Sequence, residues 1–162
     1  MSGEPVGQAQ NLPAADARAR LQQLAYTILS PSLGRRGRTL IARVAVDRAI
    51  SSGEVLNRDG LAGATYPVLR ERVVRRTLSA GRRRAVLAPR PATRPTSRLR
   101  PGAAPEPELA WLLPAARAAY ALRHLEGLDR TETHAVLAAA GVGDPATATT
   151  LADRMSPSPV RG

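Results

Sequence analysis

Arginine is the residue type whose number and spacing most directly suggest chemistry in this chain. The sequence has 24 basic residues, and all of them are arginine, since it contains no lysine. Guanidinium groups match phosphate oxygens in geometry, and each neutralised phosphate releases counterions. A solvated helix face explains such a charge run equally well. The phosphate-contact candidates lie between positions 70 and 84, where the only acid is Glu71: Arg70, Arg72, Arg75, Arg76, Arg82, Arg83 and Arg84.

The positive charge is unevenly distributed along the chain. The 162 residues carry a formal net charge of +11, with a pI near 11.6. Residues 1–104 contain 19 arginines and 6 acids, whereas residues 105–162 contain 5 arginines and 7 acids. A basic surplus of this size indicates a polyanionic partner, and we expect that partner to be DNA.

Thr147, Thr150 and Arg154 form a second candidate set, on a predicted helix that Asp144 caps. They fall at i, i+3 and i+7 and should therefore point outward. Threonine and arginine side chains contact base edges and phosphates in a major groove, so these three are candidate base contacts. From two threonines alone, ordinary exposed helix surface is the simpler interpretation. The stripe expected to face inward is Ala148, Leu151, Ala152 and Met155.

Three short helices are needed to position this second set. The first is predicted to start at Pro114, where a missing N–H costs nothing, and to end at Gly127. Asp129 begins the second helix, and Glu132 completes a capping box three residues later. This helix is predicted to stop at Gly141. Two helices joined by a short turn with glycine are typical of a helix-turn-helix, whose second helix enters a major groove.

The same segment resembles the C-terminal domain of bacterial RNA polymerase sigma factors of the extracytoplasmic-function type. The resemblance rests on Leu113-Pro114, on the phrase LRHLEGL at residues 122–128 and on Glu132, and it covers about a quarter of the chain. It implies a domain that reads an upstream promoter element. It also implies RNA polymerase core, or a regulator of the anti-sigma kind, as a partner.

The chain departs from that family in two places. Recognition helices of the family carry several basic residues, whereas residues 144–155 have Arg154 alone against two aspartates. The region that in the family grips polymerase and melts promoter DNA has Tyr26 as its only aromatic residue and Asp47 as its only acid, over residues 21–51. The leading hypothesis is a sigma-factor-like DNA-binding protein acting in transcription initiation or its regulation. The alternative is a sigma-like protein-binding module that has lost promoter recognition.

The remaining pattern predicts an all-α fold. Helices are expected over residues 14–30 and 38–51, with Ile41, Val44, Ala45 and Ala49 of the second helix facing inward. A third helix should run from Thr65 to Gly81. The predicted divisions are a disordered N-terminus (1–13), a basic helical unit (14–84), a Pro/Arg-rich linker (85–107), the helix-turn-helix domain (108–155), on which Trp111 packs, and a disordered tail (156–162).

Catalytic and metal-binding functions are not indicated. The chain has no cysteine, two histidines (His124 and His134), no glycine-rich phosphate loop and no paired acids in an apolar setting. We expect no enzyme activity, no catalytic or metal-ligating residue, no cofactor and no small-molecule substrate. No run approaches the roughly 20 apolar residues of a membrane span. We therefore expect a cytoplasmic protein without membrane contact.

Overall fold

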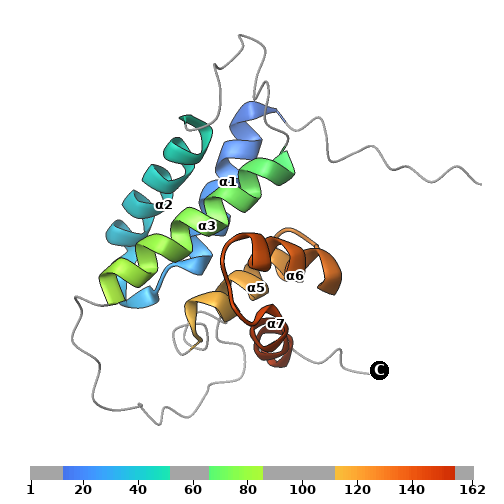
Figure 1. Cartoon of the computed structure of the whole chain (residues 1–162). Coiled ribbons are helices and arrows are strands. Elements are labelled where there is room, and N and C mark those ends of the chain that lie inside the picture. The colour runs from blue at the N-terminus through green and yellow to red at the C-terminus, as the bar shows by residue number, and fades with distance from the viewer. Residues whose placement is uncertain (1–12, 52–65, 86–111, 156–162) are drawn as a thin grey trace, which may run out of the picture.

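A computed structural model describes residues 13–51, 66–85 and 112–155, and over these ranges the chain is all-α, as predicted, with no strand. Figure 1 shows two groups of helices. One group contains α1 (Ala14–Ile28), α2 (Gly34–Ser51) and α3 (Tyr66–Ala85), with a short 3-10 turn, η1 (Pro31–Leu33), between the first two. The other contains α5 (Pro114–His124), α6 (Arg130–Ala139) and α7 (Pro145–Arg154).

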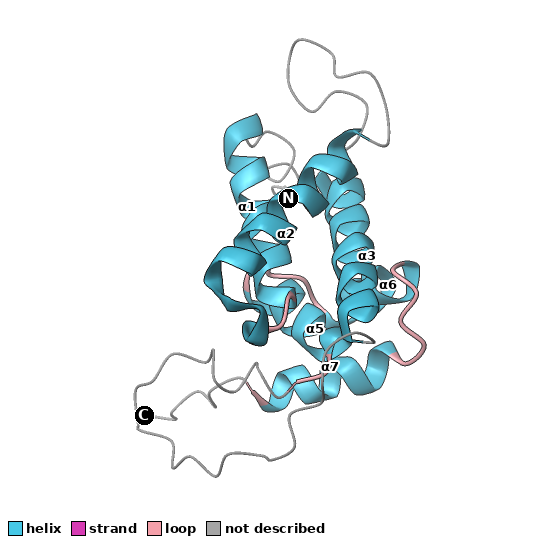
Figure 2. Cartoon of the chain, turned by 90° about the vertical axis from the view of Figure 1, so that its left-hand side faces the viewer, coloured by secondary structure: helices cyan, strands magenta, loops and turns pink. Residues whose placement is uncertain are grey.

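Helices α1, α2 and α3 pack side by side, each in contact with the other two (Figures 1 and 2). Their apolar residues recur at helical spacing, so each helix buries one stripe. In the first and third helices, every residue of this stripe is buried. These residues are Leu21, Leu24, Ala25, Ile28 and Leu29 in and just after α1, and Leu69, Val73, Val74, Thr77 and Leu78 in α3.

The predictions for α2 were partly wrong. The helix starts at Gly34, four residues earlier than expected, where a φ of +67° is accessible at little cost only to glycine. Of the face predicted to point inward, Ala45 and Ala49 are buried, whereas Ile41 is half-buried and Val44 is exposed. Ala42 and Val46 are fully packed in the core, whereas Val44 is 39 % exposed. The intrinsic pattern was ambiguous because apolar residues occur on more than one side of this helix.

The predicted end of the third helix was also wrong. Helix α3 continues through Gly81 to Ala85, and Thr65, the expected cap, lies outside the described residues. One glycine inside a helix costs about 1 kcal/mol relative to alanine, which the long buried stripe of α3 outweighs. The arginines at positions 82 and 83 therefore belong to the helix and extend its basic surface.

The C-terminal helices begin where the sequence predicts, and α6 ends just before Gly141 as predicted, whereas α5 ends at His124, three residues before Gly127. The Asp129 side chain accepts a hydrogen bond from the backbone N–H of Glu132, and Glu132 accepts one from that of Asp129, which completes the capping box. Asp144 caps α7 in the same manner, through Thr147. Gly127 has a φ of +67° and follows the last turn of α5. These local signals hold three helices of only 10 or 11 residues in place.

A single hydrophobic core joins the two groups. Helix α5 packs on α1 and α3, and α6 packs on α3, so the buried residues of all six helices form one continuous cluster. The predicted disordered ends (residues 1–12 and 156–162), residues 86–107 of the predicted linker and Trp111 lie outside the described residues. None of the described helices combines the length and apolarity that crossing a membrane requires.

Candidate functional site

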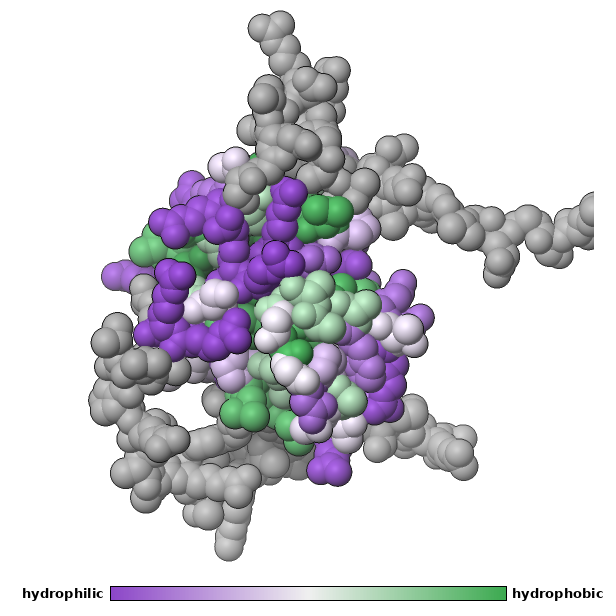
Figure 3. All heavy atoms as spheres, in the orientation of Figure 1, coloured by the Kyte–Doolittle hydropathy of each residue, from purple (hydrophilic) through white to green (hydrophobic). Residues whose placement is uncertain are grey.

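A basic groove runs along the surface between α2 and α3, with a volume of about 510 Å³. Five arginines line it, one from α2 and four from α3: Arg48, Arg72, Arg75, Arg76 and Arg83. Between them lie Ile41, Val44 and Ala45 of α2 and Ser79 and Ala80 of α3. None of the described residues that line this α2–α3 groove is an acid, so its guanidinium groups repel one another when no anion is present. Figure 3 shows the hydrophilic side chains gathered over these two helices.

Arg72 is the most constrained of the five arginines. Its Nη1 atom is buried and has no hydrogen-bond partner within the described residues. A buried donor without an acceptor is costly, and more so when it carries charge.

The seven predicted phosphate contacts differ in their surroundings. Arg72, Arg75, Arg76 and Arg83 line the groove, and Arg82 is exposed on the same helix. Arg70, and also Arg75, bind groups of the C-terminal segment. Arg70 lies 3.6 Å from a carboxylate oxygen of Glu126, and Arg75 donates to the carbonyl oxygen of Ala139 at 2.8 Å and to Glu71 at 3.0 Å. The side chain of Arg84 lies outside the described part of the chain.

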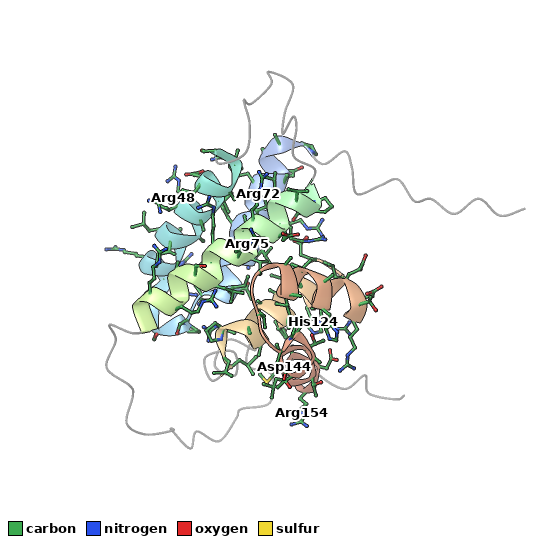
Figure 4. All side chains as sticks on the ribbon, viewed as in Figure 1. Arg48, Arg72, Arg75, His124, Asp144 and Arg154 are labelled. Carbon is green, nitrogen blue, oxygen red and sulfur yellow. The ribbon has the colours of Figure 1, made fainter. Side chains whose placement is uncertain are left out.

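Arg48 is the member of the groove that the sequence did not predict. It lies in α2, more than 20 residues before the arginine cluster of α3, and is exposed. Its position on the α2 face, one turn after Val44, would have identified it only if the orientation of α2 had been known. Figure 4 shows Arg48 and Arg72 on the two facing helices, with Arg75 further along α3.

The segment predicted as a helix-turn-helix contains α6, a turn over residues 140–144 and α7. Gly141 has a φ of +84° and donates its N–H to the carbonyl of Ala138, while Val142 donates to the carbonyl of Leu137. This pair of bonds is a Schellman motif, which ends α6 and redirects the chain. Helix α7 packs on α5 and α6. Of its predicted inward stripe, Ala148 and Ala152 are buried and Leu151 and Met155 half-buried, and Thr149 is fully buried as well.

The outer face of α7, formed by Thr147, Thr150 and Arg154, lies at the surface. The Thr147 hydroxyl donates to Asp144 at 2.6 Å, and the Thr150 hydroxyl donates to the Ala146 carbonyl and accepts from Arg130 at 2.9 Å. The hydroxyls are therefore already used within the domain. Arg154 is exposed and points away from the molecule (Figure 4).

Aspartates flank this face. Asp153 lies 2.9 Å from Arg123 and 3.8 Å from Arg130, so its charge is compensated by neighbouring arginines. Asp144 is exposed at the start of α7. Hydrogen bonds from the Thr147 hydroxyl and backbone N–H hold the pKa of Asp144 below its usual range. Asp144 is thus charged at neutral pH and reduces the attraction of α7 for phosphate.

Among the described residues, Glu126 is the one acid buried between the two groups of helices. Its side chain is 1 % exposed and lies 3.3 Å from Arg20 of α1 and 3.6 Å from Arg70 of α3. It accepts a hydrogen bond of 2.9 Å from the Tyr66 hydroxyl. Burial, and then the charge of Glu126, raise the pKa of Tyr66 well above its usual value. We call Glu126, Arg20, Tyr66 and Arg70 the Glu126 cluster.

Two buried arginines have a structural role at the end of α1. Arg38 donates to the carbonyl of Tyr26, with its guanidinium 3.9 Å from the centre of the tyrosine ring, and Arg117 donates to the carbonyls of Ile28 and Leu112. Carbonyls at a helix end lack partners within the helix, and cations near that end are favourable. Burial, with a contribution from Arg38, lowers the pKa of Arg117 to about 10, so it stays charged at neutral pH.

The described residues contain no group of three histidine, aspartate or glutamate side chains arranged to hold a metal ion. The ring of His124 packs against that of Tyr120, with 4.4 Å between the ring centres. Comparisons with known protein families, with curated proteins and with solved structures found no match to this chain.

Proposed function

We propose that this chain is a sigma-factor-like DNA-binding protein that acts in transcription initiation or its regulation. The observation that carries the proposal is the helix-turn-helix of α6 and α7. Both of its helices are capped by aspartate, and the second presents Arg154 at the surface, away from the N-terminal helices (Figure 4). Its sequence also has the sigma-like phrasing at residues 113–132.

In this proposal the N-terminal helices attract phosphate, and the C-terminal helices contact the bases. The described residues of α1 to α3 hold fourteen arginines and three acids, whereas residues 112–155 hold four arginines and five acids. Long-range attraction to phosphate therefore comes from the N-terminal helices, and exposed arginines such as Arg82 contribute to it. The outer face of α7 supplies the contact that depends on base sequence, mainly through Arg154.

Selection from a pool of genomic DNA fragments, followed by binding assays at several salt concentrations, tests this division. We expect enrichment of particular sequences by the wild-type protein. Arg154→Ala should reduce that enrichment and leave affinity for random DNA nearly unchanged. Arg82→Ala should weaken binding to all sequences alike and reduce the logarithmic salt slope by about one unit. Retention of no sequence above background would contradict the proposal.

The second candidate is a protein-binding module that keeps the fold and does not read promoters. It is favoured by the outer face of α7, where both threonine hydroxyls are engaged within the domain and Asp144 adds negative charge. Transcription reconstituted with RNA polymerase core separates the two candidates. Promoter-specific initiation supports the first, and tight binding to core without initiation supports the second.

A further inference from the structure

The α2–α3 groove combines a cluster of arginines with apolar side chains, and a DNA-binding surface needs only the arginines. We propose that it binds an acidic amphipathic helix of a partner protein. This inference goes beyond the proposed function, because it concerns a surface other than the helix-turn-helix and a partner of a different class.

Charge complementarity is the first argument. Five arginines from two helices line one groove, and none of the described residues that line it is an acid. Carboxylates accept paired hydrogen bonds from guanidinium groups, and such charge-assisted bonds are stronger than neutral ones. A row of glutamates or aspartates would therefore pair with these arginines and relieve the repulsion among them.

The apolar part of the groove is the second argument, and it favours protein over nucleic acid. Ile41, Val44 and Ala45 lie between the arginines, and Val44 is 39 % exposed. Leu40, 64 % exposed, lies one turn before Val44 on α2, and Val68, 42 % exposed, lies one turn before Arg72 on α3. Apolar surface of this kind usually marks a protein interface. A phosphate backbone has no apolar group to place against it.

The shape and position of the groove fit a helix. A groove between two packed helices receives the side-chain ridge of a third, and amphipathic helices bind to other proteins in this manner. Arginine is also enriched at the centres of protein interfaces. Arg48 and Arg72 lie at the opposite end of the view in Figure 4 from Arg154, so a helix in the groove would leave the outer face of α7 uncovered.

The test uses the full chain and a fluorescent synthetic peptide of about 18 residues, which is about five helical turns. The peptide carries leucines in one stripe and glutamates on both sides of it. A peptide of the same composition in scrambled order keeps the charge and removes the stripe. Duplex and single-stranded oligonucleotides serve as the competing class of ligand. Binding is measured by fluorescence anisotropy at about physiological salt.

We expect the amphipathic peptide to bind at least about tenfold more tightly than the scrambled one. Arg48→Ala and Val44→Ser should each weaken its binding about five- to tenfold, since one removes a charge-assisted bond and the other apolar contact. Arg43→Ala is the matched control, because Arg43 is an exposed arginine of the same helix that does not line the groove. It should change the affinity less than about twofold, as expected for an exposed charge.

Two results would overturn the inference. Equal affinity for the ordered and scrambled peptides would mean that the groove attracts negative charge without recognising a helix. Oligonucleotide binding that depends on Arg48, together with failure of the ordered peptide to bind, would assign the groove to nucleic acid. Because all three substituted residues are partly or fully exposed, thermal melting should show that the variants remain folded.

Discussion

Helices α1, α2 and α3 contain 15, 18 and 20 residues, whereas α5, α6 and α7 contain 11, 10 and 10. Helix α1 follows Pro13 and has no side-chain hydrogen bond at its cap, while aspartates cap both α6 and α7. Short helices are marginal in isolation, and local caps compensate for their length. The longer helices depend instead on the large aliphatic residues that they bury against one another.

The two groups also differ in charge, and this difference helps to join them. Glu126 is the only acid of the described residues that is buried among arginines. It belongs to the more acidic C-terminal group and contacts Arg20 and Arg70 of the basic N-terminal group. Arg75 of α3 binds the Ala139 carbonyl at the end of α6. One charge asymmetry therefore serves two purposes. It holds the groups together and leaves an excess of arginine for outside partners.

The largest expected effect concerns whether the two groups share one core. Leu24 of α1 and Leu137 of α6 are both fully buried in the same cluster. Leu24→Ala and Leu137→Ala should each lower the free energy of unfolding by about 2–5 kcal/mol. Scanning calorimetry should show a single transition that both variants shift to lower temperature. Leu40→Ala, at a position that is 64 % exposed, is the control and should change stability by less than about 0.5 kcal/mol. Two transitions, each sensitive to one variant only, would contradict a shared core.

The next effect concerns the contact between the groups. Glu126→Ala removes the acid that Arg70 and the Tyr66 hydroxyl contact, and the side chain of Arg70 is only 15 % exposed. The free energy of unfolding, measured in urea, should therefore fall by about 3 kcal/mol. Combining it with Arg70→Met should cost less than the sum of the two single changes, because each removes the same interaction. Glu71→Ala breaks an exposed pair with Arg75 and should cost less than about 1 kcal/mol. Equal losses for Glu126→Ala and Glu71→Ala would show that burial gives the Glu126 cluster no special weight.

The sequence predicts best what is decided by neighbouring residues. The caps of α6 and α7, the turn at Gly127 and the helical stripes of α1 and α3 all follow from spacings of a few residues. The burial of Glu126 cannot be predicted from such spacings, because its partner Tyr66 lies 60 residues away. Predicting the α2–α3 groove likewise requires knowing which face of α2 is buried, and the apolar pattern of α2 does not determine that face. The arginines between positions 70 and 84 consequently have different roles: some line the groove, and some contact the C-terminal helices.

A smaller effect should appear at high pH. The pKa of Tyr66 is raised, chiefly by burial and then by Glu126, so the unfolded chain loses this proton at a lower pH than the folded one. The resulting stability is complete below about pH 10, the usual tyrosine value, and is lost as the pH rises beyond it. Between about pH 9 and about pH 11, wild-type protein should therefore lose more stability than Tyr66→Phe. The lowered pKa of Arg117 acts in the opposite direction, but it is present in both proteins and cancels in the comparison. Parallel losses in the two proteins would contradict the assignment.

The smallest effect concerns the cap of α7, which belongs to the C-terminal group alone. The pKa of Asp144 is lowered by its hydrogen bonds from Thr147, first from the hydroxyl and then from the backbone N–H. A lowered pKa means that the charged cap stabilises the fold above the unfolded value, near 3.9, and that this contribution disappears as the pH falls through the folded value. Asparagine caps a helix about as well and does not titrate. Asp144→Asn should therefore melt almost as wild-type does at neutral pH and should lose less stability than wild-type between about pH 5 and about pH 2.5.

Thr147→Val removes the hydroxyl donor, so the acid-dependent loss that remains in this variant should be smaller than in wild-type. If Asp144→Asn and wild-type lose stability in parallel on acidification, the cap does not depend on its charge. Helix α1 offers no equivalent of this test, because it starts without a side-chain cap.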